Sequence, residues 1–174
     1  MSVKLKENKD QVRDLVNKIK EMARRLPEVE RKFIIGKLEE LNLANVIDLI
    51  NTVNNWYWNG KYGRLENKTK SYLYDIHNWL KRLENFFTNE AKKAELLKDI
   101  LNITEQLPKS DEKDIIKGFL ESQRMNQENL EALNNDITYW LNSGKYGDLQ
   151  GLMEDSFLKI QDLIENLLEI FKGN

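Results

Sequence analysis

The tetrapeptide Gly-Lys-Tyr-Gly stands at residues 60–63 and again at residues 144–147, 84 positions further along the chain. With this spacing, which we call the tetrapeptide offset, residues 45–88 and residues 129–172 are identical at 12 of 44 positions. Self-similarity at a fixed spacing is typical of a chain that is built from repeated structural units. The two tetrapeptides therefore predict a tandem repeat.

The self-similarity continues towards the N-terminus with an offset of 81, which we call the upstream offset. Leu26-Pro27 then matches Leu107-Pro108, and Ile34-Ile35 matches Ile115-Ile116. The change between the two offsets falls between expected helices, where a loop can absorb it. The sequence thus predicts a duplication, with one repeat over residues 1–88 and a second over residues 89–174.

Each repeat has the pattern of four helices, because its apolar residues recur every three or four positions. In the first repeat these apolar series define four helices, from Val12 to Leu26, from Val29 to Leu41, from Val46 to Trp56 and from Leu65 to Phe87. Pro27 is expected to separate the first two helices, and a capping box of Asn45 and Asp48 is one candidate start for the third, Asn42 being another.

The second repeat follows the same pattern, with Ser110 and Asn126 as expected helix N-caps. No segment alternates with a period of two, so no sheet is expected. The predicted fold is all-α, with about eight helices in two antiparallel bundles joined by short loops. Whether the fourth helix continues into the fifth stays open at residues 87–90.

The amino-acid composition is that of a globular protein and excludes several kinds of site. Of the 174 residues, 40% are hydrophobic and 32% are charged, as in a globular rather than a disordered chain. The absence of cysteine excludes disulfides, zinc–cysteine sites and thiol nucleophiles. The N-terminus has no signal-peptide pattern, and no run of about 18 apolar residues is present. We therefore expect a cytoplasmic protein without a membrane span.

Charge is divided unevenly between the two repeats. Residues 1–88 contain 17 Lys and Arg against 12 Asp and Glu, a net charge of +5. Residues 89–174 contain 10 against 17, a net charge of −7. The division is compatible with an anionic partner for the first repeat, or with attraction between halves within one chain or between two copies.

The Gly-Lys-Tyr-Gly segments have two interpretations. In the structural one, the glycines end a helix and permit a sharp turn. In the functional one, the two segments form a pair of recognition loops that present Lys61, Tyr62, Lys145 and Tyr146. Neither segment has the spacing of a phosphate-binding loop.

Aromatic residues are concentrated in the first repeat, where Tyr62, Tyr72, Tyr74 and Trp79 follow Trp56-Tyr57-Trp58. Consecutive residues on a helix point about 100° apart, so one apolar face cannot hold all of Trp56-Tyr57-Trp58. Trp58, with Asn142 as its counterpart, is expected to be partly exposed. Tyr57 and Trp58 would then form a binding patch with Lys61, Tyr62 and Arg64. In the alternative interpretation these rings fill a wide end of the first bundle.

Catalysis has no candidate residues in this sequence. His77 is the only histidine, and no Glu-x-x-His pattern for a bundle metal site is present. We predict a non-enzymatic interaction or scaffold protein without a metal or cofactor. Its partner would be a protein, bound in a groove or by the aromatic-rich first repeat, or another copy of the chain. Nucleic-acid binding by the first repeat is the alternative function.

Overall fold

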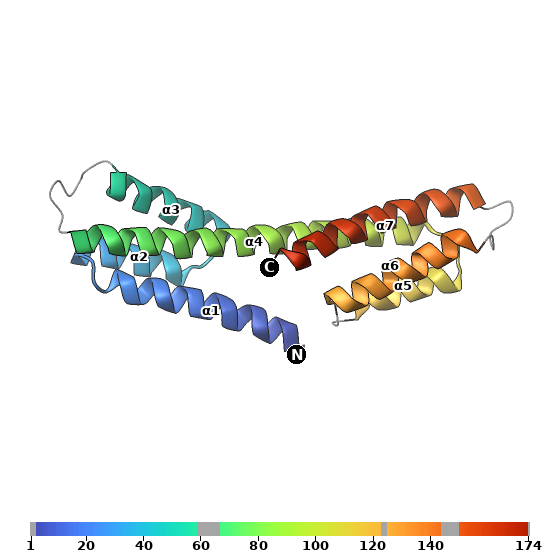
Figure 1. Cartoon of the computed structure of the whole chain (residues 1–174), viewed down its shortest axis with the longest axis horizontal. Coiled ribbons are helices and arrows are strands. Elements are labelled where there is room, and N and C mark those ends of the chain that lie inside the picture. Colours follow the sequence, from blue (N-terminus) through green and yellow to red (C-terminus); the bar gives the residue numbers. More distant parts are fainter. Residues whose placement is uncertain (1–2, 59–66, 123–124, 144–149, 174) are drawn as a thin grey trace. The chain divides into compact units, whose positions relative to one another are not determined.

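A computed structural model describes residues 3–58, 67–122, 125–143 and 150–173. Within these ranges the chain forms seven α-helices and no strand, so the all-α prediction is confirmed (Figure 1). The helices are α1 (Val3–Ala23), α2 (Glu28–Glu39), α3 (Leu43–Trp58), α4 (Asn67–Gln106), α5 (Asp111–Glu121), α6 (Gln127–Asn142) and α7 (Gln150–Lys172). None of these helices combines the length and the apolar run that crossing a bilayer requires.

The number of helices differs from the expected eight because α4 is a single element of 40 residues. It passes through residues 87–90, where a new helix was one of two alternatives. The physical reason is that residues 67–106 contain neither proline nor glycine. Thr88 and Asn89 are weak helix formers, but each lowers helix stability by less than about 0.7 kcal/mol relative to alanine. That cost is too small to end a helix.

The chain divides into two compact units, Met1–Asn89 and Glu90–Asn174, with the boundary inside α4. Unit 1 contains α1, α2, α3 and the first part of α4. Unit 2 contains the rest of α4 with α5, α6 and α7. Each unit has its own hydrophobic core.

In unit 1, α2 packs against both α1 and α3. An ion pair of 2.8 Å between Lys37 Nζ and Asp48 Oδ2 also joins α2 to α3. The cap of α3 is Asn42, whose Oδ1 accepts a hydrogen bond of 2.9 Å from the backbone N–H of Asn45. The suggested Asn45–Asp48 capping box is therefore wrong, because Asn45 already lies inside the helix. The fully buried side chains of this core include Ile19, Ile34, Val46, Leu49, Val53, Leu73, Ile76, Leu80 and Leu83.

In unit 2, α6 and α7 pack side by side (Figure 1). Both predicted N-caps are confirmed, since Ser110 Oγ accepts from the N–H of Lys113 and Asn126 Oδ1 accepts from the N–H of Asn129. The fully buried side chains of this core are Ile100, Ile116, Leu130, Ile137, Phe157, Ile160, Ile164 and Leu167.

Buried positions in the two units follow related spacings. Val46 and Leu130, which the tetrapeptide offset relates, are both fully buried. Along α2 and α5, Ile34 and Ile116 are both fully buried, and their spacing is one residue longer than the upstream offset. Ile115, which the sequence match had paired with Ile34, is 48% exposed. The matched pairs Ile34-Ile35 and Ile115-Ile116 therefore differ in which isoleucine is fully buried.

Candidate surface for partner binding

The end of α3 carries three consecutive aromatic residues that point in different directions, as the helical angle of about 100° per residue requires. Trp56 is partly buried, and its ring meets that of Phe33 on α2 edge to face at 5.7 Å. Tyr57 is also partly buried against the unit 1 core. Trp58 is 74% exposed, as predicted. At the end of α3, Trp58 is therefore exposed next to two aromatic residues, Trp56 and Tyr57, that pack towards the core.

Three rings form a continuous group, which we call the ring cluster: Tyr57, Trp58 and Tyr74. The Tyr57 and Trp58 centroids lie 4.9 Å apart at 82°, and the Tyr57 and Tyr74 centroids lie 6.4 Å apart at 43°. Both distances are in the range of favourable aromatic pairs. Tyr74, on α4, is 56% exposed. The half-buried Tyr57 therefore connects two exposed rings from different helices.

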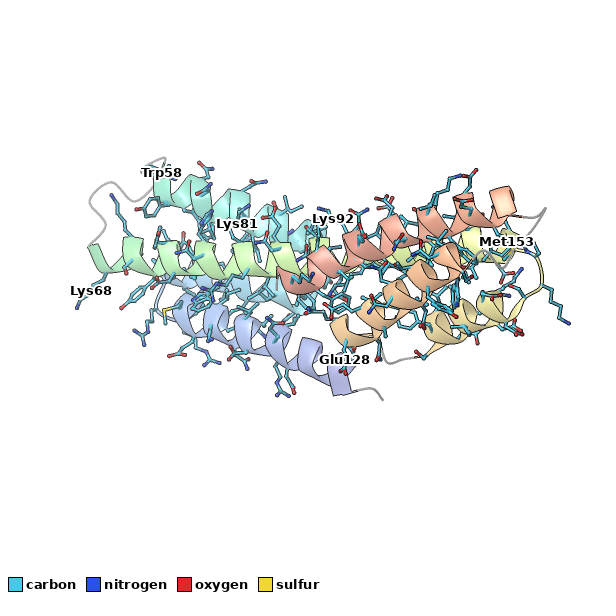
Figure 2. The ribbon with its side chains drawn as sticks, turned by 45° about the vertical axis from the view of Figure 1, so that its right-hand side comes forward. Trp58, Lys68, Lys81, Lys92, Glu128 and Met153 are labelled. Carbon is cyan, nitrogen blue, oxygen red and sulfur yellow. The ribbon has the colours of Figure 1, made fainter. Side chains whose placement is uncertain are left out.

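Positive charge lies near the ring cluster. Lys68 and Lys70, in the first turn of α4, are both exposed. Trp58 and Lys68 lie at the same end of unit 1 (Figure 2). An end of unit 1 that exposes both aromatic rings and ammonium groups can bind apolar and anionic groups together.

Two of the predicted binding residues, Tyr57 and Trp58, are thus brought together. The other five, Lys61, Tyr62, Arg64, Lys145 and Tyr146, lie outside the described residues, as do both Gly-Lys-Tyr-Gly segments. Tyr74 was not among the predicted binding residues. It was expected only as one of several aromatic residues concentrated in the first repeat, and its ring contact with Tyr57 from a different helix places it in the cluster.

Unit 2 carries no comparable cluster at the corresponding described positions. The tetrapeptide offset relates Tyr57, Trp58 and Tyr74 to Leu141, Asn142 and Leu158. Tyr139 is 71% exposed, but none of the aromatic contacts of the described residues involves it. It provides an isolated ring for comparison with the ring cluster.

A second aromatic group in unit 1 is built on Trp79 of α4. Its ring centroid lies 4.8 Å from Lys18 Nζ on α1 and 4.7 Å from Arg82 Cζ. These distances are those of cation–π contacts. Trp79 is partly buried and packs against the unit 1 core. Its indole therefore contacts α1, through Lys18, as well as the core.

Two described residues of unit 2, Glu105 and Lys117, have shifted pKa values. A hydrogen bond from Lys117 lowers the pKa of Glu105, and the same bond raises the pKa of Lys117. Their separation of 2.6 Å is that of a direct ion pair between α4 and α5. In the described part of the chain, no three His, Cys, Asp or Glu side chains converge as a metal site would require.

No protein-family model matches the chain, and searches of curated proteins and of solved structures find no significant match. The fold and the surface define an all-helical chain that exposes a group of contacting aromatic rings.

Proposed function

We propose that this chain is a non-enzymatic interaction protein whose first unit binds a protein partner through the ring cluster. The observation that carries the proposal is the exposure of Trp58 in direct contact with Tyr57, which in turn contacts the exposed Tyr74. Single exposed apolar residues are ordinary on protein surfaces, whereas contiguous exposed apolar groups mark interaction sites.

The residue types support a protein partner. Tryptophan and tyrosine are enriched among the residues that contribute most of the binding energy at protein interfaces. Each such ring can bury about 150–250 Å² of surface. Tyr57 is already held by core packing, so a partner would immobilise few side-chain bonds on binding it. The exposed Lys68 and Lys70 favour a partner whose binding surface is acidic at its rim.

We further propose that the two units arose by duplication and that only the first copy acquired the ring cluster. The common burial of Val46 and Leu130, and of Val53 and Ile137, supports this history because the tetrapeptide offset relates the members of each pair. A duplicated core with a divergent surface is what selection for one binding face would produce. The chain would then be a scaffold in which unit 2 serves another purpose.

Site-specific photocrosslinking tests the protein-partner proposal. A photoreactive phenylalanine analogue replaces Tyr74 in the full chain, expressed in the cells that naturally make it, while Trp58 is kept. We expect a discrete crosslinked protein from position 74 and none from the matched exposed position Tyr139. The purified partner should lose affinity for the Trp58→Ala variant at least about tenfold. Equal crosslinking at both positions would contradict the proposal.

Nucleic-acid binding remains the second candidate, because unit 1 has a net charge of +5 and bases stack on exposed rings. Fluorescence anisotropy with labelled single- and double-stranded oligonucleotides distinguishes the two. Phosphate contacts predict affinity that falls steeply between about 50 and about 200 mM salt. Salt-sensitive binding that disappears in Trp58→Ala would place this function first. Absence of binding to every oligonucleotide would eliminate it.

A further inference from the structure

Unit 2 contains an open surface cavity of about 360 Å³ between α4 and α7. Its lining is formed by Asp99, Asn102, Ile103, Lys159, Asp162 and Leu163. We call this the α4–α7 cavity. The volume is within the range of about 300–1,000 Å³ that is usual for binding pockets. Two of the six lining side chains are apolar and four are polar. The cavity can therefore accept an apolar group of a ligand that also carries charged groups close to it.

The related positions of α1 and α4 in unit 1 indicate which kind of side chain fits the α4–α7 cavity. The tetrapeptide offset relates Trp79 to Leu163, and the upstream offset relates Lys18 to Asp99. In unit 1 the indole of Trp79 lies against the ammonium of Lys18. In unit 2 a smaller leucine replaces the indole, and a carboxylate replaces the ammonium. The cavity is therefore matched to an indole that arrives with positive charge beside it.

Charge reinforces this match. Among the described residues, neither Asp99 nor Asp162 forms an ion pair with a lysine or arginine. Unit 2 carries a net charge of −7, whereas unit 1 carries +5. Opposite fields of this kind accelerate encounter and favour one orientation of docking. The lining carries these two carboxylates and one ammonium, that of Lys159, so a ligand that brings cations together with an apolar group meets an excess of negative charge.

The chain itself carries one group with these properties. All four of its tryptophans are described by the structure. Trp140 is buried, and Trp56 and Trp79 are partly buried against neighbouring rings or cations. Only Trp58 is exposed, and the exposed Lys68 lies at its end of unit 1 (Figure 2).

We propose that the α4–α7 cavity of one molecule receives Trp58 of a second copy, so that the chain associates head to tail. The inference rests on the proposed function, because it names a second copy as a partner of the ring cluster. Each bound pair leaves one ring cluster and one cavity available. Such heterologous contacts extend into filaments or close into rings. Contact through one cavity and one ring cluster is small, and interfaces below about 1,200 Å² are typical of weak, transient association.

Sedimentation velocity of the full chain, over a series of protein concentrations, tests the inference. We expect the average mass to rise with concentration at about 50 mM NaCl and to fall at about 500 mM NaCl, because salt screens the attraction between the charged units. Trp58→Ala and the double variant Asp99→Lys, Asp162→Lys should each weaken association by a factor of about ten or more. The matched control Tyr139→Ala should behave as the unmodified chain does.

Mixing the two variants provides the sharpest test. Trp58→Ala retains the cavity, and the double aspartate variant retains Trp58, so each alone should associate at least about tenfold more weakly than the unmodified chain. Their mixture should form a one-to-one dimer that cannot extend further, with a blue shift in the fluorescence of Trp58. Far-ultraviolet circular dichroism of each variant verifies that it is folded.

Three outcomes would overturn the inference: a monomeric unmodified chain at all concentrations, association that survives both variants, or no dimer in the mixture. The failure can be separated from that of the proposed function. A monomeric chain that still crosslinks a different protein from position 74 would refute only the self-association. A chain that neither associates nor crosslinks at position 74 would refute both.

Discussion

The ammonium of Lys117 lies 2.6 Å from the carboxylate of Glu105 and so joins α5 to the last turns of α4. A second lysine of α5, Lys113, donates hydrogen bonds of 2.7 Å to the backbone carbonyls of Glu105 and Leu107. These carbonyls lie at the end of α4, where a helix leaves carbonyl groups without helical partners. Two lysines of α5 thus bind the C-terminal end of α4, one through an ion pair and the other through hydrogen bonds.

The ion pair predicts a dependence of stability on pH. Because the folded-state pKa of Glu105 is lowered, its contribution is complete above the unfolded pKa, about 4.3, and is lost as pH falls through the lowered value. The raised pKa of Lys117 has the opposite sign, so its contribution is lost only as pH rises above that of ordinary lysine. Urea unfolding should therefore show Glu105→Gln to be less stable than the unmodified chain at pH 7, with a difference that narrows at acidic pH.

Glu165→Gln is the control for this comparison, since Glu165 is exposed on α7 and forms no ion pair within the described residues. Its stability difference from the unmodified chain should be smaller at pH 7. A gap for Glu105→Gln that stays constant from neutral to acidic pH would contradict the assignment.

Asn134 on α6 offers a route to greater stability. Its Oδ1 is buried and has no hydrogen-bond partner among the described residues. The tetrapeptide offset relates this position to the buried Ile50. A buried polar atom without a partner costs about 1–3 kcal/mol, so Asn134→Leu, of similar size, should raise the free energy of unfolding by about 1 kcal/mol. Asn135→Leu, at an exposed neighbour, should change it by less than about 0.5 kcal/mol. Equal effects at both positions would show that general hydrophobicity is responsible.

Adjacent residues of α7 should respond very differently to truncation. Phe157 is fully buried, with its ring 5.6 Å from that of Trp140, whereas Leu158 is 49% exposed. Phe157→Ala should lower the free energy of unfolding by about 3–5 kcal/mol, because it leaves a cavity in the unit 2 core. Leu158→Ala should lower it by less than about 1 kcal/mol. Comparable losses measured by urea unfolding would mean that α7 is rotated from its described orientation.

The continuity of α4 can be tested at Ala91, an exposed residue within the helix. Proline there removes a backbone hydrogen bond and clashes with the carbonyl of Phe87, at a cost of about 3 kcal/mol. Ala91→Gly, the control, should cost about 1 kcal/mol. If a new helix began near Glu90, proline would fall in its first turn and be tolerated. A stable Ala91→Pro variant would therefore divide α4 into two helices.

Local signals in the sequence were sufficient for the helices and for several of their ends. The spacing of Leu15, Ile19 and Ala23 predicts a helix with one buried face, and all three are buried. Ser110 and Asn126 were predictable as caps because each bonds to an N–H only three positions away. The exposure of Trp58 followed from the helical angle together with its polar counterpart, Asn142. The helices and their caps depend on side chains within one or two turns of each other.

Features that join distant residues were decided by the tertiary structure. Tyr57 and Tyr74 belong to different helices and meet only because α3 packs beside α4. Burial of Ile116 rather than Ile115 depends on how α5 is rotated against its neighbours, which identical side chains in a pair cannot indicate. The α4–α7 cavity likewise combines Asp99 with Leu163, which are far apart along the chain. Helical periodicity determines which face of each helix is apolar, but the packing of one helix on another selects which side chains meet.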